Sequence, residues 1–545
     1  MTDQSGGGRG RFGDDPEDAA FFEAMMAGGP DDDSFDDTVV DDSATDDTED
    51  DGPDIADLVL PVSASPHDDI LAADPVGAAA ATADLDDYTS DLVPSHPPLT
   101  LDSVEMVLNA RWPETRIVPT LSRITALADL LGNPQLAYPV IHIAGTNGKT
   151  SATRMVDSLL TAMGLKTGRF TSPHLQKVTE RISIGNVPID DERYVATFGE
   201  IAPYVDMVDA ASRESGGVAL SKFEILTAMA FAVFADAPVD VGIIEVGLGG
   251  TWDTTNIVEP AVSVVTPIGI DHIEYLGPDL TSIAGNKAGI IKSGAPAIIG
   301  PQEPEAMHVL LRRAVEQDVT VARYGYEFEV TERRIAVGGQ LLTIRGLSAE
   351  YEDIFLPLYG EHQARNAATA LAAVEAFMGA GRDKALDADT VRDGFAAAAS
   401  PGRLERVRTS PSIFIDAAHN PHGARALALA LGSEFSFTRL VGVLAVMRDK
   451  DVHGVFEALA DSFDDVVVTV NSSPRSMPVD EIAEIARDVF GDYKVHTAAR
   501  MDDALALAVD LAEDDPENAA GSAVLVTGSV VSAGDARALV GLDPA

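Results

Sequence analysis

The chain is 545 residues long and strongly acidic, with 88 Asp and Glu against 38 Lys and Arg and a formal net charge of −50. This charge excludes binding to nucleic acid or to an anionic membrane through bulk electrostatic attraction. At roughly 150 residues per domain the length predicts two to four domains. The absence of cysteine excludes disulfides, thiolate catalysis and cysteine-ligated zinc, and it fits a reducing compartment.

Half of the net charge lies in the first 100 residues, which hold 27 acidic and 2 basic side chains. Self-repulsion and a lack of apolar surface predict that residues 1–97 are a disordered acidic tail. A small apolar island within it is either a partner-binding motif or part of an inert tail: Phe21, Phe22, Met25 and Met26. The amino terminus lacks the basic start of a signal peptide, and later apolar runs are too short to span a bilayer, so we expect a cytoplasmic protein.

From Leu99 onward the pattern becomes that of a folded α/β protein. Apolar residues recur at helical spacing in 104–108 and 121–131. Next come a β-branched strand at Val140–Ala144, a glycine loop, and a helix through Met163. The same alternation returns with a helix at Ile225–Phe234 and strands at Val241–Val246 and Ala261–Val265. Alternating strands and helices predict a mainly parallel sheet covered by helices.

A second α/β series follows the turn-forming segment Ser400-Pro401-Gly402-Arg403. We therefore predict a phosphate-loop ATP-binding domain at 98–398, a hinge at 399–403 and a smaller Rossmann-like domain at 404–545. The strands expected in the second domain are Ser412–Ile415, Arg439–Leu444, Asp465–Val470, Lys494–His496 and Ala523–Val526.

The glycine loop between the first strand and helix has the composition of a phosphate-binding loop. Its backbone N–H groups would lie at a helix start, and its lysine would reach the β- and γ-phosphates. Ile143 stands where the strict Walker A pattern has its first glycine. The alternative is a glycine turn that binds no nucleotide. The residues concerned are Gly145, Thr146, Asn147, Gly148, Lys149, Thr150 and Ser151.

Two further residues follow strands at the same sheet edge and suit a divalent metal ion. Glu245 ends a strand beside the loop Gly247–Asn256, where phosphate-loop proteins hold Mg²⁺. His272 follows the next strand, and neutral imidazole also ligates divalent ions. The alternatives are an ordinary acid at a strand end and a structural histidine.

In the second domain, Asp416 follows a predicted strand and His419 comes three residues later. Loops at the carboxyl ends of parallel strands bind ligands in α/β domains, although this segment also fits a plain turn with a helix N-cap. The sequence has no serine nucleophile elbow, no HExxH helix and no dinucleotide fingerprint in the right setting, so hydrolase and dehydrogenase functions lack support.

Taken together, these motifs resemble the folylpolyglutamate synthase/dihydrofolate synthase family of the Mur-ligase-like superfamily. The resemblance covers about residues 99–545 and leaves out the acidic tail. The motifs occur in the family's order: His142–Lys149, Thr171–Leu175, Ser221–Glu224, Glu245–Asn256, Gly269–His272, Asn286–Lys292, Pro401–Arg403 and Asp416–Pro421.

The resemblance implies ATP-dependent amide formation. A substrate carboxylate attacks the γ-phosphate to give an acyl phosphate and ADP, and the amine of L-glutamate then attacks the acyl carbon. Dihydropteroate would give dihydrofolate, and a reduced folate would give its polyglutamate. The family also implies a monomer whose partners are small molecules, with domain closure gating catalysis.

Residue roles also follow from the resemblance. Residues 146–149 would cradle ATP, with Asn366, Arg403 and Asp416 completing the nucleotide site, while Ser172, Glu245 and His272 would ligate Mg²⁺. Lys287 matches a lysine that the family carries as a carbamate, able to hold a second Mg²⁺; the alternative is an unmodified lysine paired with phosphate. His419 matches a residue near the transferred phosphoryl group. The positions that match the pterin site are Ser221, Lys222, Phe223, Glu224, Trp252, Asp253 and Thr254.

One local departure is that many folate-branch members have glycine after the loop lysine, whereas this chain has Thr150-Ser151. The sequence leaves open which of the two hydroxyls faces the metal.

Three other functions remain in competition with a bifunctional synthase. They are an enzyme restricted to folate polyglutamylation, a Mur-like ligase for another carboxylate, and a non-enzymatic nucleotide-binding regulator. The excess of acid with only 9 lysines fits a high-salt cytoplasm, and its concentration in one segment also fits a regulatory or solubilising tail.

Overall fold

The computed structural model describes residues 99–111, 118–381, 384–514 and 521–544. The predicted acidic tail, with its apolar island, lies outside these residues. All the described residues belong to one compact unit. Within them, none of the helices has both the length and the apolar character needed to cross a membrane.

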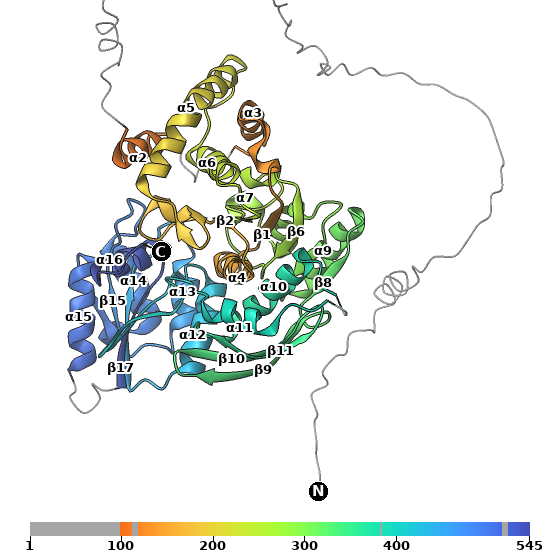
Figure 1. The fold of residues 1–545 in the computed structure, drawn as a ribbon. Helices are drawn as coiled ribbons and strands as arrows, with labels where there is room; N and C mark the ends of the chain where they lie inside the picture. The colour runs from red at the N-terminus through yellow and green to blue at the C-terminus, as the bar shows by residue number, and fades with distance from the viewer. Residues whose placement is uncertain (1–98, 112–117, 382–383, 515–520, 545) are drawn as a thin grey trace, which may run out of the picture. The chain divides into compact units, whose positions relative to one another are not determined.

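An eight-stranded, mainly parallel sheet carries the predicted phosphate loop (Figure 1). Its strand order is β4-β3-β2-β5-β1-β6-β7-β8, and only β3 and β4, at one edge, run antiparallel to their neighbours. β1 is buried along its whole length, as its β-branched sequence predicts. The strands are β1 (Val140–Ala144), β2 (Thr167–Phe170), β3 (Ile182–Ile184), β4 (Val187–Pro188), β5 (Val241–Glu245), β6 (Pro260–Val265), β7 (Ala297–Ile299) and β8 (Val321–Arg323).

Helices cover both faces of this sheet, and alternate side chains of β1 point to opposite faces. Ile141 and Ile143 pack in the core under α4 (Lys149–Ala162), α10 (Glu361–Phe377) and α11 (Ala388–Ala396). Val140 and Ala144 join the two cores on the other face. The helices there are α2 (Leu101–Asn109), α3 (Ser122–Leu130), α5 (Asp191–Glu214), α6 (Lys222–Asp236), α7 (Ile273–Leu276), α8 (Leu280–Lys287) and α9 (Pro304–Glu316).

A three-stranded antiparallel sheet, absent from the sequence interpretation, packs against α10 and α11. It consists of β9 (Glu329–Ala336), β10 (Gly339–Arg345) and β11 (Glu350–Leu356). Glu375 of α10 is fully buried and accepts hydrogen bonds from the Ser348 backbone N–H and the Tyr351 hydroxyl, at 3.2 and 2.9 Å. The carboxylate thereby holds the β10–β11 loop on the helix.

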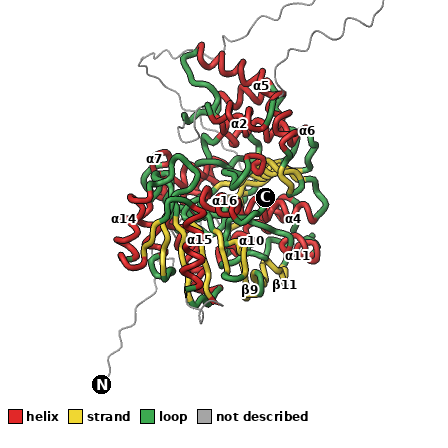
Figure 2. Tube along the Cα trace, turned by 90° about the vertical axis from the view of Figure 1, so that its left-hand side faces the viewer, coloured by secondary structure: helices red, strands yellow, loops and turns green. Residues whose placement is uncertain are grey.

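A six-stranded sheet forms the rest of the chain, with the order β12-β13-β17-β14-β15-β16 and an antiparallel edge strand, β12. Figure 2 shows these strands between α14 and α15. The strands are β12 (Glu405–Thr409), β13 (Ser412–Ile415), β14 (Arg439–Leu444), β15 (Asp465–Val468), β16 (Val495–Thr497) and β17 (Ser522–Thr527). The helices are α12 (Pro421–Glu434), α13 (Val452–Leu459) and α14 (Val479–Phe490) on one face, and α15 (Met501–Glu513) and α16 (Val530–Leu539) on the other.

The predicted strands at Val140–Ala144, Ser412–Ile415 and Arg439–Leu444 are confirmed at both ends. The strand predicted to reach Val470 ends at Val468, and the one predicted at Lys494–His496 lies one residue later. Short 3₁₀ helices complete the chain: η2 (Pro134–Leu136), η3 (Val178–Arg181), η4 (Thr254–Ile257), η5 (Ala288–Ile290) and η6 (Asp492–Lys494). The domain boundaries at 398 and 404 stay predictions.

Candidate active site

The loop between β1 and α4 has the backbone geometry of a phosphate cradle. Gly148 has φ of +85° and directly precedes Lys149, the first residue of α4. A Cβ on Gly148 would lie 2.7 Å from Oδ1 of Asn366, and one on Gly145 would lie 2.0 Å from Oγ1 of Thr266. Glycine is therefore required at both positions, and the backbone N–H groups of the helix start are left to face an anion.

A partly buried lysine and a buried one meet at one carbonyl of this loop. Nζ of Lys149 donates to the carbonyl oxygens of Gly145 and Thr146, at 3.0 and 3.1 Å. Nζ of Lys287, at the end of α8, donates to the same Gly145 oxygen at 2.8 Å. Burial, together with the nearby Lys149 charge, lowers the pKa of Lys287 to about 7. A fraction of this lysine is therefore neutral and nucleophilic near neutral pH.

Glu245 ends β5 as predicted and points at the start of α4. Its Oε1 accepts a hydrogen bond from Oγ1 of Thr150 at 2.9 Å, and the Ser172 backbone also donates to the carboxylate. Burial raises the pKa of Glu245 to about 7, although Lys149 and the Thr150 hydroxyl act in the opposite direction. Its second oxygen, Oε2, is buried without a hydrogen-bond partner. Such a carboxylate is poised for a cation.

Thr150 and Ser151 take different environments. The Thr150 hydroxyl faces Glu245, whereas the Ser151 hydroxyl lies 2.9 Å from that of Ser400 and accepts from Nε2 of Gln363 at 3.3 Å. The sequence left open which of the two hydroxyls faces the metal site. In the structure, the Thr150 hydroxyl lies beside the candidate metal ligand Glu245.

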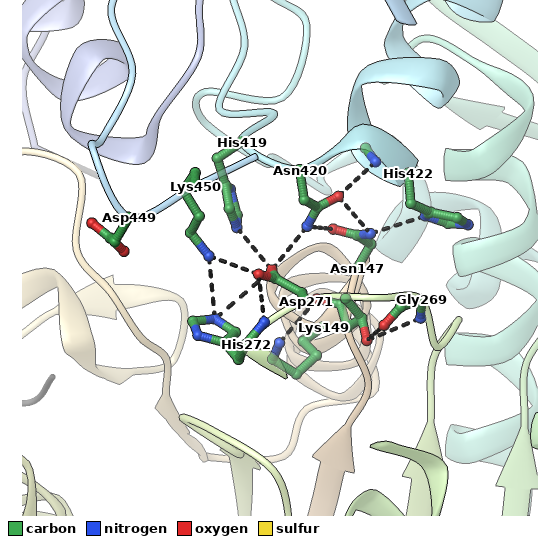
Figure 3. A network of polar contacts seen from close by, with 12 residues as sticks. Asn147, Lys149, Gly269, Asp271, His272, His419, Asn420, His422, Asp449 and Lys450 are labelled. Carbon is green, nitrogen blue, oxygen red and sulfur yellow. Dashed lines mark hydrogen bonds and ion pairs between the residues drawn. The ribbon is translucent and has the colours of Figure 1, made fainter. Parts of the chain in front are cut away.

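Asp271 is the centre of a polar network formed by segments far apart in the chain (Figure 3). Its carboxylate accepts from Nζ of Lys450 at 2.8 Å and from Nδ2 of Asn420 at 3.0 Å, and it lies 3.7 Å from Nε2 of His419. Burial alone would raise the pKa of Asp271, but the nearby His419 and His272 rings and the charge of Lys450 hold it well below its usual range. Asp271 is therefore a stable anion beside the phosphate loop.

The same network brings His272 and His419 close to the loop. Nε2 of His272 lies 3.8 Å from Asp271 and 3.5 Å from Nζ of Lys450. Nδ1 of His419 lies 3.0 Å from the Ala417 carbonyl oxygen, which places a proton on that nitrogen. The other ring nitrogen, Nε2, then faces the Asp271 carboxylate.

The loop asparagine connects the two series of strands directly. Nδ2 of Asn147 donates to Oδ1 of Asn420 at 3.2 Å and to Nδ1 of His422 at 2.9 Å. Asn420 is also the N-cap of α12. The predicted nucleotide residue Asn366 lies against Gly148 and donates to Gln363 at 3.2 Å.

Asp416 and Arg403 shape the segment between the two sheets. The Asp416 carboxylate accepts from the backbone N–H groups of Leu404 and Ala418, both at 2.8 Å. Burial raises the Asp416 pKa, and the Arg403 charge opposes that effect. Arg403 thus lies near Asp416, and a shared role in binding nucleotide stays a prediction.

The candidate pterin-site residues of α6 all have structural partners. Ser221 and Glu224 form the capping box of the helix, and Glu224 also accepts from Nε of Arg123 at 3.0 Å. Nζ of Lys222 pairs with Glu105 at 2.9 Å. The Phe223 ring packs so closely on Gly247 that a Cβ on this glycine would lie 2.5 Å from the ring.

The candidate residues after β5 lie in a tightly bonded loop. Asp253 is buried and accepts from the Leu248 N–H at 2.8 Å and from the Thr255 hydroxyl at 2.6 Å. Oγ1 of Thr255 also lies 2.9 Å from Nε2 of His142, a buried β1 residue. Thr254 begins η4, and Trp252 packs against the core beneath α8 and α9.

Sequence reasoning gave no role to Lys450, Asn420 or His422. Lys450 follows the carboxyl end of β14, in the segment Asp449-Lys450-Asp451. The rule used for Asp416, that polar residues after parallel strands meet at one edge, would have indicated it. Across the described residues, no group of three or more His, Cys, Asp or Glu is arranged to hold a metal ion by protein ligands alone.

Comparison with known proteins identifies the family. The Mur ligase middle domain model matches residues 217–374, and the model of the Mur ligase, glutamate ligase domain matches residues 402–530. A dihydrofolate synthase/folylpolyglutamate synthase of Mycobacterium tuberculosis is 57% identical over 462 residues, which cover 82% of this chain and 95% of that protein. The chain belongs to the dihydrofolate synthase/folylpolyglutamate synthase family.

Other members of the dihydrofolate synthase/folylpolyglutamate synthase family agree. The Escherichia coli dihydrofolate synthase/folylpolyglutamate synthase is 36% identical over 366 residues, 67% of this chain and 80% of that protein. The structure of Mycobacterium tuberculosis folylpolyglutamate synthase complexed with ADP has a TM-score of 0.79 at 56% identity, covering 82% of this chain and 99% of that one. Escherichia coli FolC in complex with DHPP and ADP has a TM-score of 0.70 at 32% identity, covering 81% and 98%. The chain therefore has the two-domain Mur ligase fold.

Proposed function

We propose that the chain is an ATP-dependent ligase that adds L-glutamate to dihydropteroate, making dihydrofolate, and to reduced folates, making polyglutamates. The observation that carries this proposal is the meeting of Lys149, Lys287 and Glu245 around the phosphate loop of a chain in this family. Its partners are small molecules: ATP, L-glutamate and the pterin or folate acceptor. Relatives in complex with ADP and DHPP support this substrate set.

The nucleotide is assigned to the loop between β1 and α4. The N-terminal N–H groups of α4 and the ammonium of Lys149 would neutralise the phosphates. To reach them, Lys149 must leave the loop carbonyls of Gly145 and Thr146 that it contacts here. Asn366, Arg403 and Asp416 would contact the nucleotide from the other side, so that ATP lies between the 98–398 and 404–545 domains.

Mg²⁺ fits the donor set beside this loop, because Glu245 has a buried oxygen without a partner. We assign Glu245, Ser172 and His272 as its protein ligands, with Thr150 next to them. Phosphate oxygens and water would supply the remaining ligands, as is usual for Mg²⁺. When bound, the ion neutralises phosphate charge. Lys287, whose pKa is lowered to about 7, would hold a second ion as its carbamate.

In the reaction, a carboxylate oxygen of the acceptor attacks the γ-phosphorus and the bond to the ADP oxygen breaks, giving an acyl phosphate. The glutamate amine then attacks the acyl carbon, the C–O bond to phosphate breaks, and the amine loses a proton. Bringing anions together requires cationic neutralisation and positioning. Lys149 supplies charge at the loop. We assign His419, which contacts the Ala417 carbonyl oxygen and faces Asp271, to the transferred phosphoryl group.

The acceptor would bind along α6 and the loop after β5. The structural bonds of Ser221, Lys222, Glu224 and Asp253 fix this surface. Phe223, Trp252 and Thr254 then remain as the side chains to contact a pterin ring.

The test is ADP release by the purified protein with Mg²⁺, ATP and L-glutamate, comparing dihydropteroate, tetrahydrofolate and no acceptor, with mass spectrometry of the products. Formation of dihydrofolate and of glutamylated tetrahydrofolate is expected. Activity with tetrahydrofolate alone would make the chain a folylpolyglutamate synthase only. An absence of acceptor-dependent ADP release would refute both folate functions and favour another carboxylate or a regulator.

A further inference from the structure

The loop between β2 and η3, residues 171–177, carries Ser172 and begins at the eight-stranded sheet. The Ser172 backbone donates to the carboxylate of Glu245, the assigned metal ligand. At the base of the loop, the N–H of Thr171 donates to the carbonyl oxygen of Arg181 at 2.9 Å. One end of the β2–η3 loop is thus fixed to the sheet that carries the phosphate loop.

Glu180 fixes the conformation of the β2–η3 loop from within. Its carboxylate accepts from the backbone N–H groups of Leu175, Gln176 and Lys177, at 2.8, 3.0 and 2.9 Å. Glu180 is buried, so these charge-assisted hydrogen bonds are shielded from water. Three consecutive amides bound to one carboxylate make the loop a stiff connection, which moves as a unit.

The other end of the loop packs on the part of the chain that forms the six-stranded sheet. The Leu175 side chain lies against the core cluster built by β13, β14, β17 and α16. A Cβ on Gly534 of α16 would overlap the Leu175 carbonyl oxygen, and one on Gly402 would lie 3.1 Å from Cδ2 of Leu175. Gly402 belongs to the predicted hinge. The loop therefore contacts both the hinge and α16 with no space between them.

Arg537 of α16 joins the loop to two other segments. It is only 4% exposed. Its Nε donates to Oε1 of Gln176 at 3.0 Å, one terminal nitrogen pairs with Glu405, and the other donates to the Asp543 carbonyl oxygen at 2.9 Å. Nε2 of Gln176 also donates to the Leu542 carbonyl oxygen at 2.8 Å. A planar guanidinium with partners on three segments fixes their relative positions.

Glu405 extends this contact to the hinge. One of its oxygens pairs with Arg537, and the other accepts from the N–H of Gly402 at 2.8 Å. Glu405 is also the first residue of β12, at the edge of the six-stranded sheet. A continuous set of bonds therefore runs from the hinge through Glu405 and Arg537 to Gln176, and along the β2–η3 loop to Ser172.

We propose that Arg537 is a positioning residue, which acts through Gln176 and the β2–η3 loop to place Ser172 beside Glu245. The inference rests on the proposed function, since it takes Ser172 and Glu245 as ligands of the Mg²⁺ that accompanies the nucleotide. A displacement of α16 would move the loop and with it one metal ligand. Mg²⁺ binding at the eight-stranded sheet is thereby linked to the position of the six-stranded sheet.

The test compares Arg537→Gln and Gln176→Ala with the unaltered protein. By hydrogen-exchange mass spectrometry of the metal-free protein, we expect the amides of residues 171–177 to exchange about tenfold faster in both variants. By calorimetry, Mg²⁺ should raise the affinity of the unaltered protein for ADP, and this gain should be about fivefold smaller in both variants. In EDTA, their affinity for ADP should stay within about twofold of that of the unaltered protein.

Gln176→Ala keeps the test decisive if Arg537→Gln does not fold. Gln176 is only half-buried, and its replacement leaves the pair between Arg537 and Glu405 in place. The variant removes the side-chain bonds from the loop to Arg537 and to Leu542. The loss is thus confined to the connection that the proposal invokes.

Arg333→Gln is the matched control, because Arg333 also forms an ion pair between the two series of strands. Arg333 of β9 pairs with Glu434 of α12 and donates to Oε1 of Gln340 at 2.6 Å. Neither partner belongs to the β2–η3 loop. Arg333→Gln should lower the thermal stability, while the exchange of residues 171–177 and the effect of Mg²⁺ on ADP affinity should match those of the unaltered protein.

Unchanged exchange of the loop in both variants would overturn the proposal, and so would faster exchange with an unchanged effect of Mg²⁺. Equal changes in Arg333→Gln would also overturn it, because any lost contact between the sheets would then suffice. These measurements need no turnover. If they give the expected results but the protein shows no acceptor-dependent ADP release, the folate function fails and the positioning role stands. Acceptor-dependent ADP release with unchanged loop exchange would keep the function and remove the positioning role.

Discussion

Replacing Gly148 with alanine tests the phosphate loop where its geometry is most restrictive. At φ of +85° an L-residue is less stable than glycine by about 1–2 kcal/mol. The new Cβ would lie 2.7 Å from Oδ1 of Asn366, so this amide must move and lose its hydrogen bond to Gln363, worth about 1 kcal/mol. We therefore expect the free energy of unfolding to fall by about 2–3 kcal/mol.

Gly164→Ala provides a matched control from the other end of the same helix. Gly164 also has φ of +85°, but a Cβ there has no atom within 4 Å. This variant carries the backbone strain without the collision. Its free energy of unfolding should fall by only about 1–2 kcal/mol.

The assay is calorimetric titration with ADP and Mg²⁺, alongside thermal unfolding of both variants. Returning the displaced loop of Gly148→Ala to its native conformation on binding would cost about 2 kcal/mol, which lowers the affinity for ADP about 30-fold. The affinity of Gly164→Ala for ADP should stay within twofold of that of the unaltered protein. Equal ADP affinity in Gly148→Ala and the unaltered protein would refute the assignment of this loop to nucleotide. Equal losses in both variants would refute the role of the collision with Asn366.

Four further substitutions test neighbouring groups. Glu245→Gln should abolish turnover yet stabilise the metal-free protein. Burial raises the pKa of Glu245 to about 7. Ionisation of Glu245 therefore destabilises the folded state as the pH rises from the pKa of the unfolded chain toward 7. In thermal unfolding, the free energy of unfolding of the variant relative to the unaltered protein should rise from pH 5 to pH 8, reach a difference of about 3 kcal/mol and then level off. A difference that does not depend on pH would contradict this. In steady-state kinetics, Thr150→Ala should lower kcat more than tenfold. In denaturant unfolding, Ser151→Ala should instead lower the free energy of unfolding by about 1 kcal/mol. A loss of kcat in Ser151→Ala with a loss of stability alone in Thr150→Ala would exclude Thr150 as the hydroxyl beside the metal. Thr255→Val removes the link between Asp253 and His142 and should lower the free energy of unfolding by about 1–3 kcal/mol, measured by urea denaturation; an unchanged midpoint would show that the loop after β5 is held by other contacts.

The sequence predicted the parallel strands well because strands buried on both faces have continuous apolar sequences. β1 and β14 consist mostly of β-branched and aliphatic residues, and both begin and end where predicted. β9 was missed for the opposite reason: Glu-Val-Thr-Glu-Arg-Arg-Ile-Ala is only partly buried and lacks clean alternation. Its place in a sheet depends on pairing with β10, which is a tertiary contact.

The candidate site was predictable in part, where a residue follows a buried strand. Glu245 and Asp416 were found by that rule, and both lie at strand ends. The sequence could not predict whether Thr150 or Ser151 faces Glu245. Adjacent helix residues point in different directions, and only the packing of the helix decides which residues each one contacts. The pairing of Lys450 with Asp271 spans 179 residues and depends on how the two sheets are placed.

The strand order β2-β5-β1-β6 also has a consequence for how the chain folds. Thr150 and Glu245 are 95 residues apart in sequence, Gly145 and Lys287 are 142 apart, and Asn147 and Asn420 are 273 apart. Contacts of such long sequence separation form slowly, because each must close a large loop of chain. During synthesis, the phosphate loop is made long before the strands and segments that complete its surroundings. A chain released early, or still growing, would hold the loop sequence without the assembled site, so nucleotide would bind tightly only after the C-terminal sheet has folded.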